Sequence, residues 1–482
     1  MTKLLTAICL FSILFSSCIL FGRETELDGN FWALNFVNER HYRVHADKLA
    51  YNDLVEIWVQ RGSDVTQAEA QKVADFYYDY VYPRMRDSFF WTKNINGRYM
   101  DPMQFANFLL GNDGSARLTI LLFDIIDGFV PGGGFIGGYF TSNDFFTNNR
   151  HSNSRAMVYV DIYPLEINSP EFFRVIAHEF MHLIVFLTDN LYLAGNPPRR
   201  THATELWINE GLAESAEWVV TGMKNRSRIN WFNRDLTGYI SQGDNFFVWN
   251  NYRHDPLAVL NDYATVNLFF QWLRLQTDND IFKRILTAPH SNYGAILYAL
   301  ENSQYEHQLT DKSWGDLIKL WYAANYFNRV GVYGYWADYL NIVLRAPLPL
   351  IINTITDSRY VNLFPGEGIF SRLSGESFFP STDGNIRHIS LNSQSIDTTF
   401  NYNSNTLLTL NINTNINAGV QQGLTTGEGF RARFQDDGSL AIQPEVSVFP
   451  YAHRIGVGDI FMRQRLDNTD LIELLRGAEI AE

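Results

Sequence analysis

Apolar and polar residues along the chain follow two different patterns. Up to about residue 350, short apolar runs such as Leu54–Gln60, Arg117–Ile125 and Ala156–Pro164 are separated by longer stretches with helical periodicity. Short β-branched apolar runs predict buried strands. Beyond about residue 350, apolar and polar residues alternate between clusters of Gly, Asn and Asp, which is typical of antiparallel sheet. The pattern predicts an α+β fold followed by a C-terminal antiparallel β domain.

The helical stretches carry their own boundary signals. Thr66 and Glu69 have the spacing of a capping box, so a helix is expected to begin after Thr66. It is expected to end before Pro83, because proline disfavours helical geometry in the residue before it. Residues 255–350 are predicted to be mostly helical. The glycine-rich stretch Val130–Phe140 is not followed by a helix with phosphate-loop spacing, which excludes a nucleotide site there.

The segment Arg174–Phe186, RVIAHEFMHLIVF, predicts a buried helix with an unusual polar centre. Ser169 can cap this helix, and Pro170 suits its first turn. Apolar residues cover every side of the helix, so it belongs in a protein interior. Burying two histidines and a glutamate there costs several kcal/mol unless they have partners. A bound cation would offset that cost.

His178 and His182 are four residues apart, so their side chains share one helix face about 5–6 Å apart at Cβ. Two imidazoles at this separation can bind one zinc ion. Glu179 is rotated by about 100° from His178, toward a water on the metal rather than the metal itself. The HExxH pattern His178–His182 therefore predicts a zinc site with Glu179 as general base.

A third ligand must come from outside this motif. Position 188 is Thr188, which excludes a third histidine six residues after His182. The following segment, Glu205–Trp218, predicts a helix with four carboxylates, of which three share one face by their spacing. A solvated acidic face is the alternative, although the apolar residues between them leave little room for one. The candidates are Glu205, Glu210, Glu214 and Glu217.

The motif HEFMH followed by WINEGLAE resembles the gluzincin metallopeptidases, and in particular the hyicolysin family of bacterial zinc peptidases. Upstream, VADFYYDYVYP, LTILLFDIIDGF and GGYFTSNDFF keep the order and character of that family. The likeness covers roughly residues 30–275. The 27 residues between His182 and Glu210 form a longer connection than in thermolysin-like enzymes. The resemblance implies a thermolysin-like zincin domain with a mixed sheet, an active-site helix and a helical subdomain.

The resemblance also implies roles for individual residues. His178, His182 and Glu210 would be zinc ligands, with Glu205 as a rival to Glu210 outside the NEG context. Glu214 would hydrogen-bond His178 and fix its tautomer. Tyr263 would donate to the developing oxyanion; its rivals are Tyr239, His202 and His254. An extended peptide substrate would lie along a sheet edge, for which Phe135–Phe140 is the candidate strand.

These observations divide the chain into four parts. Residues 1–22 are expected to be a signal peptide or lipoprotein anchor. Residues 30–165 would be the N-terminal α/β part of a catalytic domain, and 166–350 its zinc-binding and helical part. Residues 351–482 would form a β-sandwich-like domain.

Composition and the N-terminus add the cellular context. The net charge is −14 and no basic run occurs, so nucleic acid is a poor partner. Both cysteines lie in the first eighteen residues, which excludes a cysteine metal cluster beyond them. Lys3 and the apolar run after it are typical of a secretory signal peptide. Leu14–Cys18 resembles a relaxed bacterial lipobox that departs from the motif at Phe15, and an uncleaved anchor is the alternative. We expect lipidation at Cys18 and a place in the bacterial cell envelope, outside the cytoplasm.

The function expected from the sequence is hydrolysis of peptide bonds by a zinc-dependent endopeptidase. Its partner would be a peptide or protein substrate, and its membrane contact would be the N-terminal lipid anchor. The alternative is an envelope binding or adhesion lipoprotein with a structural zinc. A closed structural site needs a fourth protein ligand, for which His202 and Glu205 are the candidates.

Overall fold

The computed structural model describes most of the chain between residues 29 and 335 and short segments beyond it. The first range excludes residues 96, 112–116, 132–133, 195–198, 235–239, 241–258, 279 and 305–306. The later segments are 351–352, 366, 368–372, 386–391, 396–397, 408–413, 431–434, 440–443 and 451–455. The anchor predicted for residues 1–22, with Cys18, lies outside the described residues, as do Tyr239 and His254.

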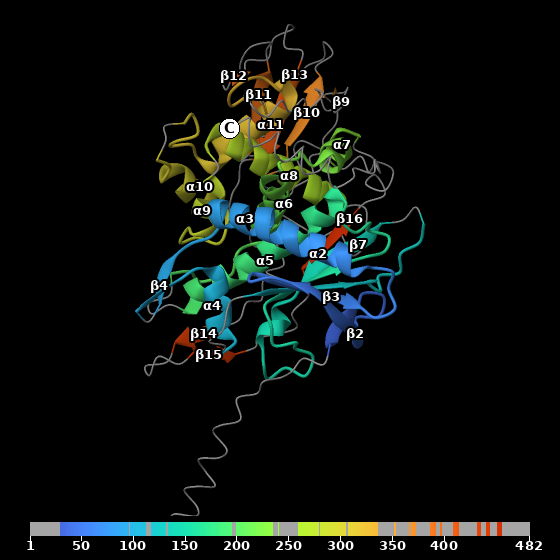
Figure 1. Cartoon of the computed structure of the whole chain (residues 1–482). Helices are drawn as coiled ribbons and strands as arrows, with labels where there is room; N and C mark the ends of the chain where they lie inside the picture. Colours follow the sequence, from blue (N-terminus) through green and yellow to red (C-terminus); the bar gives the residue numbers. More distant parts are fainter. Residues whose placement is uncertain are drawn as a thin grey trace, which may run out of the picture.

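A seven-stranded mixed sheet forms the base of the molecule (Figure 1). Its order is β1-β2-β3-β6-β8-β7-β16. The pairs β3–β6 and β6–β8 are parallel, and the other neighbours are antiparallel. The predicted strands are present with slightly shorter bounds, and β6 lies in the middle of the sheet, as its continuous apolar run indicates. The bounds are β1 Asn30–Asn35, β2 Arg40–Tyr51, β3 Val55–Gln60, β6 Leu118–Phe123, β7 Phe135–Phe140, β8 Met157–Asp161 and β16 Tyr451–Ile455.

The remaining described strands form smaller sheets. A five-stranded sheet has the order β12-β11-β13-β10-β9, and β14–β15 and β4–β5 are two-stranded pairs. Strands do occur in the region where the sequence predicts them, but β16 joins the N-terminal sheet. The sandwich predicted for residues 351–482 stays a prediction. The bounds are β4 Lys93–Ile95, β5 Arg98–Met100, β9 Ile351–Ile352, β10 Gly368–Arg372, β11 Ile386–Leu391, β12 Ile396–Asp397, β13 Leu408–Asn413, β14 Arg431–Phe434 and β15 Leu440–Gln443.

The first helix begins where predicted, and a second helical segment follows it without a break. Thr66 and Glu69 form the complete capping box of α2 (Gln67–Phe76). The chain then passes through a π-helical turn, Tyr77–Val81, directly into α3 (Tyr82–Ser88). Pro83 lies in the first turn of α3, where its missing N–H is tolerated. α2 itself ends before Pro83, as predicted, but helical structure continues through the π-helical turn into α3.

The other helices cover one face of the sheet and continue into a helical layer (Figure 1). α5 packs on β7 and β8, α6 packs on α5, and α8 packs on α6. The bounds are α4 Pro102–Leu109, α5 Pro170–Ala194, α6 Leu206–Thr221, α7 Arg226–Arg234, α8 Val259–Gln276, α9 Ile281–Leu286, α10 Tyr293–Glu301 and α11 Trp314–Phe327, with a 3-10 turn at Ser142–Phe145. This order matches the mixed α/β architecture expected of a metalloprotease domain.

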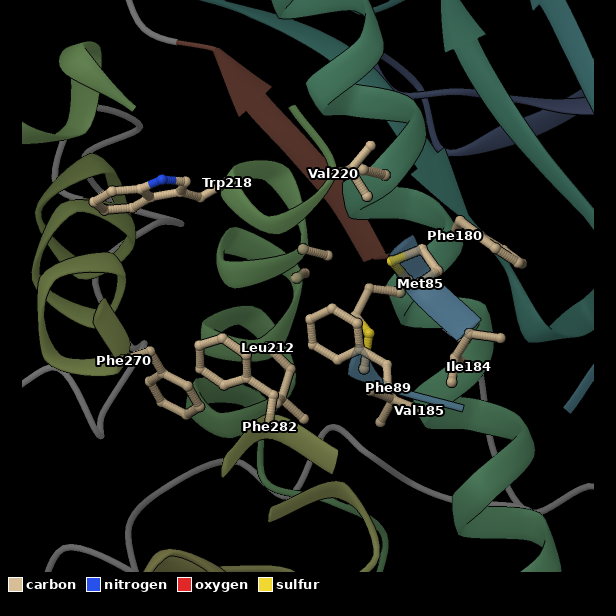
Figure 2. Close-up of a cluster of buried hydrophobic side chains, with 14 of the residues drawn as sticks. Met85, Phe89, Phe180, Ile184, Val185, Leu212, Trp218, Val220, Phe270 and Phe282 are labelled. Atoms are coloured by element: carbon tan, nitrogen blue, oxygen red, sulfur yellow. The ribbon is translucent and has the colours of Figure 1, made fainter. Parts of the chain in front are cut away.

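Two apolar clusters hold these layers together. The larger one lies on the α5 side of the sheet and extends through the helical layer. Figure 2 shows part of it, where Phe180 and Ile184 of α5 lie near Met85 of α3. The smaller cluster covers the opposite face of the sheet and includes Tyr139 and Tyr159. Among the described helices, none is both long enough and apolar enough to cross a membrane.

Candidate metal centre

α5 brings the HExxH residues into the interior, as its all-round apolar surface predicts. The Ser169 hydroxyl accepts the backbone N–H of Phe172, which caps the helix start as expected. His178, Glu179 and His182 are all fully buried, at 0% exposure. These polar groups are shielded from bulk solvent, and their neighbours must offset the cost of burial.

α6 delivers the carboxylates to the same place. Glu210, Glu214 and Glu217 are 3%, 0% and 1% exposed, which excludes the solvated acidic face. Gly211 allows α6 to approach α8 closely, because a Cβ there would lie 2.3 Å from a ring carbon of Phe270. The sequence therefore places three acidic side chains on a buried helix held tightly between α5 and α8.

His178, His182 and Glu210 converge on one point. The Nε2 atom of His178 lies 3.2 Å from Oε2 of Glu210, and Nε2 of His182 lies 3.5 Å from the same oxygen. One ligand atom from each residue lies within 4.8 Å of the other two. Two imidazole nitrogens and a carboxylate oxygen are a donor set that suits zinc.

The hydrogen bonds of the two Nδ1 atoms, on the far side of each ring from Glu210, show why a cation fits beside the two Nε2 atoms. Nδ1 of His178 lies 3.0 Å from Oε1 of Glu217, and Nδ1 of His182 lies 2.9 Å from Oδ1 of Asn209. Both oxygens are acceptors, so each Nδ1 carries a proton and donates it. In the neutral rings, both Nε2 lone pairs then face the carboxylate of Glu210. Three electron-rich atoms at this separation repel one another unless a metal ion or protons lie between them, so the residues fit a metal.

The close contacts between the histidines and the carboxylates also shift pKa values in the chain without metal. Burial lowers the pKa of His178, but the neighbouring carboxylates of Glu210, Glu217 and Glu179 outweigh it and raise the pKa well above its usual value. Burial raises the pKa of Glu210, yet the charge of His182 and the contacts with both histidines bring it down to about 2. The site therefore favours positive charge beside Glu210, which protons supply in the absence of a metal.

Glu179 occupies a space that a glycine on β7 leaves open. A Cβ at Gly138 would lie 2.5 Å from Cγ1 of Val175 and 3.1 Å from Cγ of Glu179. Two adjacent residues of β16 lie opposite Gly138 and Ile136 of β7, so the pairing skips Gly137. Gly137 is therefore the extra residue of a bulge. The bulge turns Gly138 toward α5. Glu179 is therefore held under the sheet at the point where β7 crosses the helix.

The contact that the sequence assigned to Glu214 is made by Glu217. Glu217 accepts from His178 and also from Nδ2 of Asn225 at 2.7 Å. Glu214 instead lies 2.9 Å from the Arg228 guanidinium and 3.1 Å from Nδ2 of Asn267. The correction has a geometric cause, since α7 and α8 bring a cation and an amide donor to Glu214. Glu217 and Asn209 are the two partners of the histidines that sequence reasoning missed.

We expect Glu217→Gln to lower the affinity for zinc by about 10- to 100-fold, because the orienting acceptor of His178 would lose its charge. The measurement is zinc competition against a chromogenic chelator. Glu214→Gln is the matched comparison: it should lower the unfolding temperature through its Arg228 partner and change zinc affinity less. Equal loss of affinity in both variants would contradict the assignment to Glu217.

Tyr263 lies at the edge of this centre. It is buried, its ring centroid is 6.2 Å from that of His178, and the Arg228 guanidinium lies 4.7 Å from its ring centre. Burial, together with the charge of Glu210, raises its pKa well above the usual value. Its hydroxyl therefore stays protonated and can act as a donor.

The rival residues lie elsewhere. The carboxylate of Glu205 accepts from Nε1 of Trp207 at 2.7 Å, at the N-cap of α6. His202 is exposed and its ring contacts Thr201. Among the described residues, neither belongs to the group of potential ligands around His178.

Comparison with known proteins points in the same direction. No protein-family model matches the chain. The chain is similar to the neutral metalloprotease ShpI of Staphylococcus hyicus, with 26% identity over 298 residues. The matched part is 60% of this chain and 60% of that protein, so the chain spans less than two thirds of its relative. The similarity supports a metalloprotease family at modest identity.

Proposed function

We propose that the protein is a zinc-dependent endopeptidase of the gluzincin type, related to the hyicolysin family. The observation that carries the proposal is the convergence of His178, His182 and Glu210 in the interior, with both Nδ1 atoms donating to fixed acceptors. The similarity to a neutral metalloprotease supports the same reaction class. His178, His182 and Glu210 would hold the zinc ion and leave one position for water.

The residues around the metal divide the reaction between them. A zinc ion held by His178, His182 and Glu210 would supply a water of pKa about 7 and a Lewis acid for the peptide carbonyl. Glu179 takes the proton from the attacking water and passes it to the leaving amine. Tyr263 donates a hydrogen bond to the oxygen that becomes negatively charged. Glu217 and Asn209 hold the two imidazoles in the tautomer with Nε2 free of a proton.

The structural-zinc alternative has less support. Such a site needs a fourth protein ligand, and the two candidates, His202 and Glu205, contact other residues. No observation in the described part of the chain favours a closed site.

The test of the proposed function is a peptide-library cleavage assay with metal-depleted protein and added zinc. We expect internal cleavage of peptides to return in proportion to zinc and to saturate at one equivalent per chain. Stoichiometric zinc binding without cleavage of any library member would favour the structural-zinc reading instead.

For the N-terminus we propose export and lipidation at Cys18, which places the enzyme in the cell envelope. The support comes from the apolar run after Lys3 and the lipobox-like Leu14–Cys18. We expect wild type to partition into detergent in a Triton X-114 extraction, and Cys18→Ser to lose labelling by a palmitate analogue. Equal labelling of both would contradict lipidation at this residue.

A further inference from the structure

We propose that Tyr451–Ile455, strand β16, occupies the edge of the sheet along which an extended substrate would bind, so that the chain carries its own inhibitory segment. This inference rests on the proposed function. It also corrects a sequence-based expectation, since β7 was predicted to be a free edge and is paired on both sides. Figure 1 shows β16 in red beside β7, apart from the five-stranded C-terminal sheet.

The pairing has the geometry of an added strand. β16 runs antiparallel to β7, with Tyr451 opposite Phe140 and Ile455 opposite Phe135. An edge strand offers one row of backbone N–H and C=O groups, and a peptide that adds to it uses the same groups. β16 and a substrate peptide therefore cannot pair with β7 at the same time.

The position of β16 places it over the catalytic helix. His453 lies opposite Gly138 in the register, next to the bulge at Gly137. Gly138 is the residue whose missing Cβ makes room for Glu179. β16 also contacts α5 directly. The backbone of the internal strand thus passes the proposed general base, where the scissile bond of a substrate would have to lie.

Because β16 belongs to the same chain as β7, it competes for the edge of β7 more effectively than a free peptide does. Pairing of a segment of the same chain is intramolecular and does not depend on the protein concentration, whereas binding of a free peptide depends on its concentration. A free peptide at micromolar concentration then competes poorly for the same edge. Release of β16 is expected to increase peptide binding at least tenfold.

The test uses the full chain with Ala452→Pro and His453→Pro together. Adjacent residues of a strand direct their N–H groups to opposite sides of the strand. One of the two prolines therefore removes an N–H group that faces β7. The control is Ala441→Pro with Ile442→Pro, which places the same two substitutions in the β14–β15 pair and does not alter the sequence of β16. Hydrogen exchange should rise at Phe135–Phe140 in the first variant and stay unchanged in the control. Unchanged exchange at β7 in the first variant would overturn the inference.

Two further readouts separate this inference from the proposed function. In a Glu179→Gln background, a fluorescent peptide copying residues 449–457 should bind the β16 variant at least tenfold more tightly than the parent or the control. With Glu179 present, hydrolysis of a library peptide should rise by a similar factor. Tighter binding without hydrolysis would support the internal strand and contradict the peptidase. Equal binding and equal hydrolysis in all three proteins would overturn the internal strand alone, and the absence of both binding and hydrolysis would overturn both.

Discussion

Replacement of Glu179 by glutamine is expected to lower kcat for peptide hydrolysis by about 10²- to 10⁴-fold, the range typical of a lost general base. Glutamine has nearly the same shape, so it fits the space beneath Gly138 that glutamate occupies. It cannot take a proton from water. The measurement is kcat on a library peptide with zinc at one equivalent in metal-clean buffer.

The control for this variant is Glu171→Gln, a charge-neutralising change in the first turn of the same helix. Zinc content and unfolding temperature should match wild type in both variants, which separates loss of chemistry from loss of structure. Full turnover by Glu179→Gln would refute the assignment of the general base.

Removal of the metal is the second change with a large expected effect. Binding to the folded state alone stabilises a protein by RT ln(1 + [L]/Kd), about 4 kcal/mol when the metal is present at a thousand times Kd. We expect chelation to lower the unfolding temperature by several degrees or more and to abolish peptide hydrolysis. Calorimetry with and without chelator, followed by zinc re-addition, measures both effects. An unchanged unfolding temperature would contradict a zinc ion bound in the folded core.

The loss on chelation is expected to grow with pH. In the metal-free chain the pKa of His178 is raised, so its contribution to stability is present below its unfolded value and lost as pH rises through the folded value. The pKa of Glu210 is lowered to about 2, so its contribution is present above the unfolded value and lost only in strong acid. Chelated protein should therefore be more stable near pH 6 than near pH 9. Zinc-loaded protein should show the smaller dependence over this window, because metal replaces the protons beside Glu210.

Local signals predicted much of the fold. The capping box at Thr66, the central strand Leu118–Phe123 and the capped helix after Ser169 each depend on residues close together in sequence. The π-helical turn before Pro83 has no comparable local signal, and its buried residues Tyr77 and Val81 belong to the larger apolar cluster. Pairing of β7 with a strand more than 300 residues later also has no local signal, since any alternating strand can complete an edge.

For the site, spacing within one helix was informative and contact between helices was not. The i, i+4 rule placed His178 and His182 together, and the i+7 spacing put Glu217 on the face of Glu210. The partner of Glu214 was beyond the reach of that rule, because Arg228 comes from the next helix. The only sequence signal for the contact of Asn209 with His182 was the position of Asn209 directly before Glu210.

The central claim is that this buried centre binds zinc through His178, His182 and Glu210 and leaves one place for water. Zinc K-edge X-ray absorption of the protein loaded with one equivalent tests it most directly. We expect two imidazole nitrogens and two oxygens at about 2.0–2.2 Å, with one oxygen exchangeable for azide. A spectrum that azide leaves unchanged, fitted by four protein ligands, would contradict the open site and with it the proposed chemistry.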